Sequence, residues 1–141
     1  MTGSIAASSN IMSLLNFSTT LTKYAFYCLF QHCTSLTTAP ELPATTLADY
    51  CYNGMFLSCQ SLTQAPELPA TTLTYYCYFG MFNSCKNLNY IKAMFITDQN
   101  LNTYLGGWVG GVSPTGTFVK SKDATWNRSS VVPDGWTVQT V

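Results

Sequence analysis

Residues 47–72 read LADYCYNGMFLSCQSLTQAPELPATT, and the 26 residues before them, 21–46, read LTKYAFYCLFQHCTSLTTAPELPATT. Laid in register, the two stretches agree at 15 positions, including an unbroken APELPATT. A third copy begins at Leu73 and loses the pattern after Tyr90. A fixed period of this length is typical of stacked supersecondary units that share one core. The sequence therefore predicts a repeat architecture.

Each unit divides into two halves of different character. The first half spaces its apolar residues near i, i+4, i+5 and i+8, which predicts one face of a helix. In the second unit these residues are Tyr50, Cys51, Met55, Phe56, Cys59 and Leu62. The second half is predicted to be one short strand that ends at Pro66 and Pro69, because proline cannot donate a hydrogen bond into a sheet. Stacking of the units would place Leu36, Leu62 and Leu88 in one buried column of a short parallel sheet.

We therefore expect an α/β fold, a short leucine-rich-repeat solenoid of about three 26-residue helix–strand units with a mixed, β-containing C-terminal cap. The predicted units are residues 21–46, 47–72 and 73–97. Residues 1–20 are interpreted as a degenerate half-repeat that caps the N-terminal end. Residues 98–141 have lost the period and are predicted to close the C-terminal end, where an open sheet edge would otherwise promote aggregation.

The predicted C-terminal cap contains its own local signals. Residues 116–119 and 135–138 are rich in β-branched and aromatic residues after a glycine, which predicts two strands. Residues 100–104 are expected to form a short helical turn. The cap also carries three tryptophans, Trp108, Trp126 and Trp136. They are interpreted as its core, with a tryptophan-lined carbohydrate site as the alternative.

Five of the six cysteines follow the repeat. Cys33, Cys59 and Cys85 lie one period apart, and so do Cys51 and Cys77. On the predicted helix Cys51 and Cys59 would be about 12 Å apart, whereas a disulfide requires Cα atoms within about 7 Å. We expect stacked, buried free thiols and neither disulfides nor a metal site, because zinc sites need closely spaced ligands.

The amino-acid composition narrows the range of possible functions. Only 9% of the residues are charged, and six acidic residues balance six basic ones. This composition argues against binding to nucleic acid, which depends on clustered Lys and Arg, and equally against binding to anionic membrane surfaces. No apolar stretch is long enough for membrane insertion, and no signal peptide is expected in this chain. No nucleophile–base pair, paired carboxylates or phosphate loop stands out, so we expect no enzymatic activity and no cofactor.

The repeated spacing of phenylalanine, cysteine and leucine resembles a known family. Its three occurrences are Phe30…Cys33…Leu36, Phe56…Cys59…Leu62 and Phe82…Cys85…Leu88, and Ala25–Phe26 precedes the first. The pattern is similar to the signature A-F-x-x-C-x-x-L-x-x-I of BspA-like leucine-rich repeats, over residues 21 to about 95. The resemblance implies a non-enzymatic adhesin or recognition protein, located at a bacterial cell surface, in the extracellular space or on a phage virion.

We accordingly expect a binding or adhesion module that recognises a protein or glycan on a host or cell surface through its repeats. The candidate partner-binding residues beside the leucine column are Ser35, Thr37, Ser61, Thr63, Gln64, Asn87, Asn89 and Tyr90. Tyr75 and Phe79 are expected to face outward, because their columns vary between units and contain charge; the other units have Lys23 and Asp49 in one column and Tyr27 and Asn53 in the other. Either the C-terminal segment covers them or they form a partner patch. The alternative function is a structural spacer or assembly segment of a surface fibre or virion, which would form a homo-oligomer.

Overall fold

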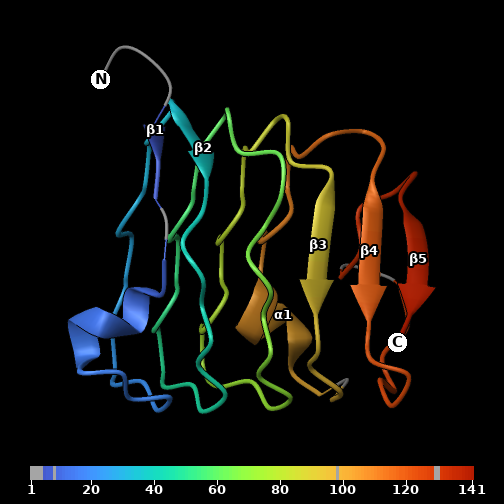
Figure 1. Ribbon diagram of the computed structural model, residues 1–141. Coiled ribbons are helices and arrows are strands. Elements are labelled where there is room, and N and C mark those ends of the chain that lie inside the picture. The colour runs from blue at the N-terminus through green and yellow to red at the C-terminus, as the bar shows by residue number, and fades with distance from the viewer. Residues whose placement is uncertain (1–4, 8, 98, 129–130) are drawn as a thin grey trace.

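The computed structural model describes residues 5–7, 9–97, 99–128 and 131–141. The chain runs down one layer and returns through a second, so that successive units lie side by side (Figure 1). The strands are β1 (Ile5–Ala6), β2 (Leu36–Thr38), β3 (Tyr90–Ala93), β4 (Thr117–Lys120) and β5 (Thr137–Thr140). The helices are the short 3-10 helix η1 (Ile11–Leu15) and α1 (Leu101–Leu105). We call the layer that holds β1 to β5 the strand layer and the other the turn layer.

Two small parallel sheets form the strand layer. β1 pairs with β2, and β3, β4 and β5 pair in that order. Single bridges from Gln64 to Tyr90 and from Leu68 to Ala93 connect the second unit to β3. The predicted strands at 116–119 and 135–138 are confirmed by β4 and β5 to within one or two residues, and the predicted turn at 100–104 is confirmed by α1.

The predicted α/β solenoid of helix–strand units is wrong. Within the described residues α1 is the only α-helix, and residues 49–58 form a run of turns where a helix was expected. Backbone N–H groups in this run alternate between two kinds of partner. Met55 donates to the carbonyl of Tyr52 in its own unit at 3.1 Å, whereas the next residue, Phe56, donates to Met81 of the next unit at 3.0 Å.

The backbone angles explain why the helix does not form. Tyr50, Gly54 and Ser58 have φ values of 59°, 61° and 61°, whereas a right-handed helix needs φ near −63° at every residue. A left-handed residue at every fourth position also repeats the burial pattern every four residues. Cys51, Met55 and Cys59 are accordingly fully buried. The four-residue spacing of the apolar residues therefore arises from repeated turns.

The predicted leucine column is buried, but it is not a three-stranded sheet. Leu36, Leu62 and Leu88 are all fully buried. Leu36 alone of the three lies in a strand, β2. The other two follow the turn run, and the N–H of Leu62 is bonded to the carbonyl of Cys59 at 3.2 Å. The leucines therefore fill the core directly after the turns.

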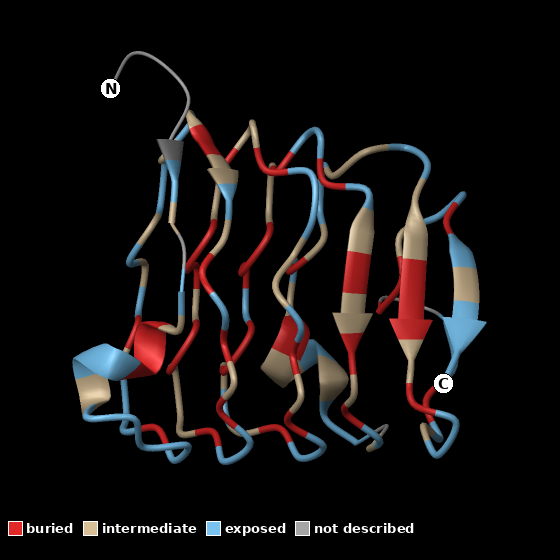
Figure 2. Ribbon diagram, viewed as in Figure 1, coloured by how far each residue is buried: buried red, intermediate tan, exposed pale blue. Residues whose placement is uncertain are grey.

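The core lies between the two layers, where buried residues of successive units meet (Figure 2). Aromatic rings stack from unit to unit at centroid distances of 5.6 to 6.2 Å. One stack is Phe26, Tyr52, Tyr78 and Trp108, and the other is Phe30, Phe56 and Phe82. Register between units is therefore set by bulky side chains as well as by the backbone ladder.

The three tryptophans are core residues of the C-terminal segment. All are buried, and each indole N–H donates to a backbone carbonyl: Trp108 to Val131 at 3.0 Å, Trp126 to Phe95 at 3.0 Å and Trp136 to Ser113 at 2.7 Å. A buried indole whose N–H is satisfied has no ring face left for a sugar. The alternative of a tryptophan-lined carbohydrate site is therefore wrong.

All six cysteines are free thiols, as expected. Cys51, Cys59, Cys77 and Cys85 are buried, while Cys28 and Cys33 are half-buried. The Cys59 thiol donates to the carbonyl of Phe30 at 3.1 Å, and the Cys85 thiol donates to the equivalent carbonyl of Phe56 at 3.0 Å. Burial raises the pKa of both thiols to about 12, which keeps them protonated and unreactive.

Candidate binding surfaces

The strand layer brings together three of the eight polar residues predicted there. Thr37, Thr63 and Gln64 line one shallow hollow of about 220 Å³. Tyr90 lies beside it, at the start of β3, and bridges Gln64 through the backbone. The hollow offers hydroxyl and amide groups from two neighbouring units.

Two of the predicted residues instead hold the units together. The Ser61 hydroxyl donates to the carbonyl of Thr34 at 2.6 Å, and the Asn87 amide donates to the carbonyl of Gln60 at 2.7 Å. Each bond spans 27 residues, and the Asn87 bond is the Ser61 bond repeated one unit later. The remaining two, Ser35 and Asn89, lie half-buried and exposed respectively at the edges of this layer. Ser61 and Asn87 therefore have a structural role.

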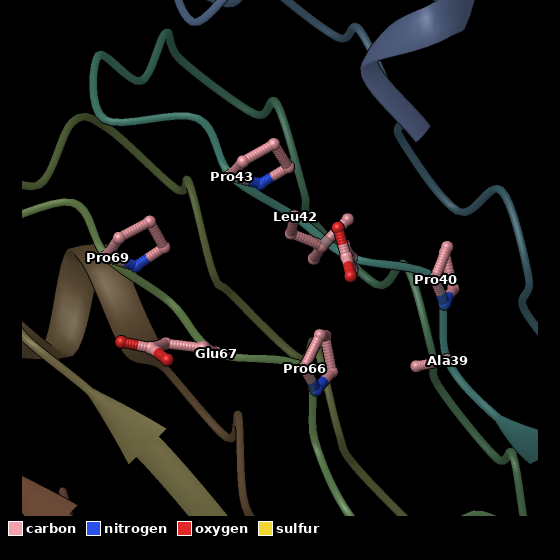
Figure 3. Close-up of a pocket in the computed structure, with 8 residues that line it drawn as sticks. Ala39, Pro40, Leu42, Pro43, Pro66, Glu67 and Pro69 are labelled. Atoms are coloured by element: carbon pink, nitrogen blue, oxygen red, sulfur yellow. The ribbon is translucent and has the colours of Figure 1, made fainter. Parts of the chain in front are cut away.

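A larger groove continues from this hollow and shares Ala39 and Pro66 with it. We call it the proline groove; its volume is about 430 Å³. Its lining comes from the first and second units and consists of Ala39, Pro40, Glu41, Leu42, Pro43, Pro66, Glu67 and Pro69 (Figure 3). The sequence predicted that such prolines end a strand and did not indicate a groove, although the repeated APELPATT places the prolines at equivalent positions in the two units.

The turn layer carries the largest exposed group of aromatic side chains in the described residues, which we call the aromatic row. It consists of a stacked trio, Tyr24, Tyr50 and Tyr76, and three flanking rings, Tyr27, Tyr75 and Phe79. The trio stacks at centroid distances of 4.9 and 5.0 Å with 20° between ring planes. The flanking rings lie at 63° to 89° to their neighbours in the trio.

This geometry decides what the row presents to solvent. Tyr24 and Tyr76 cover the two faces of Tyr50, which leaves mainly the edge of the Tyr50 ring open to solvent. The exposed fractions of the flanking side chains are 49% for Tyr27, 49% for Tyr75 and 38% for Phe79. A contiguous exposed apolar patch of this kind marks an interaction site more often than scattered single residues do.

The row is electrically neutral. One ion pair borders it, Lys23 to Asp49 at 3.6 Å, and Asp49 also accepts the backbone N–H of Tyr75 at 3.2 Å. Partial burial, followed by the neighbouring Tyr24 and Tyr76, raises the pKa of the Tyr50 hydroxyl above its ordinary value. The hydroxyl therefore stays protonated at neutral pH and can both donate and accept a hydrogen bond.

The sequence identified only part of the row. Tyr75 and Phe79 were predicted to face outward, and both are exposed. The C-terminal segment covers Phe79 in part, because Gly106 lies so close that a Cβ there would be 2.3 Å from the Phe79 ring. Tyr50 was placed in the core by the helical projection, but it lies half-buried in the row. The signal that could have identified the trio is the tyrosine that recurs every 26 residues.

The described residues show neither a metal-binding cluster nor a membrane-spanning helix. The described residues contain no cluster of three or more side chains suited to hold a metal ion. Among the same residues, neither helix has the length and apolar character needed to span a membrane. Comparisons with known protein families, with curated proteins and with solved structures find no match to this chain.

Proposed function

We propose that the protein is a non-enzymatic binding module that attaches to a protein partner through the aromatic row. The observation that supports it is the group of six exposed or half-buried aromatic rings on a neutral surface. Tyrosine is among the residues that most often dominate binding energy at protein interfaces. The resemblance to BspA-like repeats further supports a location on a bacterial cell surface or a phage particle.

The stacked trio makes the row suitable for binding before any partner arrives. Immobilising a free side chain at an interface costs roughly 0.5–1.5 kcal/mol. Tyr50 is already held between Tyr24 and Tyr76, so little of this cost remains for it. Tyrosine also has only two side-chain torsions and supplies apolar area together with a hydroxyl. The row therefore offers preorganised contact area with hydrogen-bonding groups at its rim.

A protein partner fits this geometry better than a glycan does. Sugar rings bind aromatic residues through the flat ring face, and stacking in the trio covers both faces of Tyr50 and one face each of Tyr24 and Tyr76. The exposed edges and hydroxyls suit the mixed apolar and polar surface of a protein.

Flow cytometry of fluorescently labelled protein on intact bacterial and epithelial cells tests the proposal. We expect saturable binding that protease treatment of the cells removes and periodate oxidation of surface sugars leaves intact. The double variant Tyr27→Ala, Tyr75→Ala should weaken binding by about tenfold or more, as expected for interface anchors. The matched control is Phe17→Ala, which removes a ring that is 69% exposed but lies outside the row.

Three results would count against this function. The first is the absence of saturable binding to either cell type by folded protein. The second is binding that only periodate removes, which would assign a glycan. The third is a sedimentation experiment in which the protein forms a stable oligomer that the double variant disrupts, because the row would then be an assembly contact of a fibre or virion.

A further inference from the structure

The proline groove is rigid and lies on the strand layer, whereas the aromatic row lies on the turn layer. Its proline rings have fixed φ angles, and Leu42 at its base is fully buried. Both walls are held by backbone hydrogen bonds: the N–H of Glu41 to the carbonyl of Ser9 at 3.0 Å, and the N–H of Leu68 to that of Lys92 at 3.0 Å. The groove is therefore formed before any ligand binds, so little ordering accompanies binding.

Two carboxylates give the groove a negative charge that is only partly balanced. Glu67 is paired with Lys92, with 3.0 Å between Oε1 and Nζ. Glu41, one period earlier in the same column, makes no ion pair within the described part of the chain. The repeat explains the difference, because the position equivalent to Lys92 in the preceding unit is occupied by Pro66. The groove thus combines apolar walls with one carboxylate, that of Glu41, which has no cationic partner among the described residues.

We propose that the proline groove binds an extended peptide segment through an arginine side chain. The methylene stem of arginine packs well along apolar surface while its charged end stays in a polar environment. The planar guanidinium matches a carboxylate in a two-point contact, which favours arginine over lysine. In the groove the stem lies against the proline rings, and the guanidinium donates to the carboxylate of Glu41. Anionic segments are repelled by the same charge.

A titration followed by ¹H–¹⁵N NMR tests this site with a defined probe, acetyl-Gly-Ser-Arg-Ser-Gly-amide. The expected result is a saturable shift of the backbone amides of Glu41, Leu42 and Glu67. The same peptide with citrulline, a neutral isostere of arginine, should produce no comparable shift. The shift should also diminish as the salt concentration rises, because the contact is an exposed charge pair.

Three variants assign the effect to individual charges. Glu41→Gln should weaken peptide binding by about fivefold, in line with an exposed charge-assisted contact. Lys92→Met should strengthen it by about twofold, because it frees the carboxylate of Glu67. The control is Asp134→Asn, which removes an acidic group from a separate hollow beside Trp108 and should leave binding unchanged.

The proposal is overturned if the arginine and citrulline peptides shift the same amides equally, or if Glu41→Gln binds as well as the wild type with a well-dispersed spectrum. It is also overturned if the groove amides shift when the protein alone is concentrated, since the groove would then accept a second copy of the chain. These outcomes are independent of the cell-binding experiment, because the aromatic row and the groove share no residue.

Discussion

Replacement of Ser58 by glycine should stabilise the protein, and this change tests the turn layer directly. Ser58 has a φ of 61°, and a left-handed conformation costs a residue with a side chain roughly 1–2 kcal/mol. Glycine adopts it freely but loses roughly 0.5–1 kcal/mol more in chain entropy on folding. The difference predicts a gain of about 0.5–1 kcal/mol in the free energy of unfolding. In a helix the same change would lower stability by about 0.5 kcal/mol, so the two folds predict opposite signs.

Guanidinium chloride unfolding, followed by the fluorescence of the three buried tryptophans, measures this difference. The corresponding increase in Tm is about 1–4 °C for a domain of this size. Gln60→Gly is the matched control, because Gln60 lies two residues away and does not have a positive φ. It should lower the free energy of unfolding by about 0.5–1 kcal/mol. If Ser58→Gly destabilises the protein as the control does, the left-handed turn run is wrong.

Two further predictions concern the core. Tyr52→Phe should raise the free energy of unfolding by about 1 kcal/mol in a denaturant titration, because the buried Tyr52 hydroxyl has no hydrogen-bond partner in the described structure. The equivalent position of the first unit already holds a phenylalanine, Phe26, so the ring stack accepts this residue. A loss of stability would mean that the hydroxyl of Tyr52 is hydrogen-bonded. Burial raises the pKa of the Cys51 and Cys85 thiols from about 9 to about 12, so the folded state binds protons that the unfolded state releases. The contribution of these two thiols to the free energy of unfolding should therefore be fully present below pH 9 and be lost as the pH rises toward 12. The Cys51→Ala, Cys85→Ala variant should show a shallower fall, and an unchanged slope would contradict the assignment.

The identity of the core residues could be read from the sequence, even though their backbone could not. Met55, Phe56 and Leu62 were expected to be buried from their spacing, and all three are. A helix buries residues near every third or fourth position, and a run of four-residue turns does so as well. The two conformations therefore share a pattern, and the spacing of apolar residues cannot separate them.

The choice between helix and turns depends on contacts that a single unit does not contain. Half of the N–H groups in residues 50–59 bond to the next unit, as Tyr52 does to Cys77 at 3.1 Å. Within one unit these groups would be unsatisfied, so local propensity favours a helix that satisfies every N–H internally. Glycine at positions 54 and 80 was the local hint, because a glycine in mid-helix is unfavourable while a left-handed turn accepts it.

The candidate surfaces were predictable to a different extent on each layer. Thr37, Thr63 and Gln64 were expected to face outward beside the leucine column, and in the structure they line one hollow. The aromatic trio was not predicted, because the incorrect helical projection placed Tyr50 in the core. The groove was hidden because its cavity is formed by two units, and only their three-dimensional stacking shows that Pro43 and Pro69 face one space.

The repeat separates a constant part of the aromatic row from a variable part. The trio is tyrosine in every unit, so its stacking is a property of the repeat. The flanking columns differ: one holds Lys23, Asp49 and Tyr75, and the other holds Tyr27, Asn53 and Phe79. Only in the third unit are both flanking residues aromatic, and there the centroids of the Tyr75 and Phe79 rings lie 4.3 and 5.0 Å from that of Tyr76. We therefore place the centre of the proposed partner contact in the third unit. The ion pair of the first two units, Lys23 and Asp49, lies at its rim. Charges at the rim of an interface contribute little to affinity and more to the orientation of the partner.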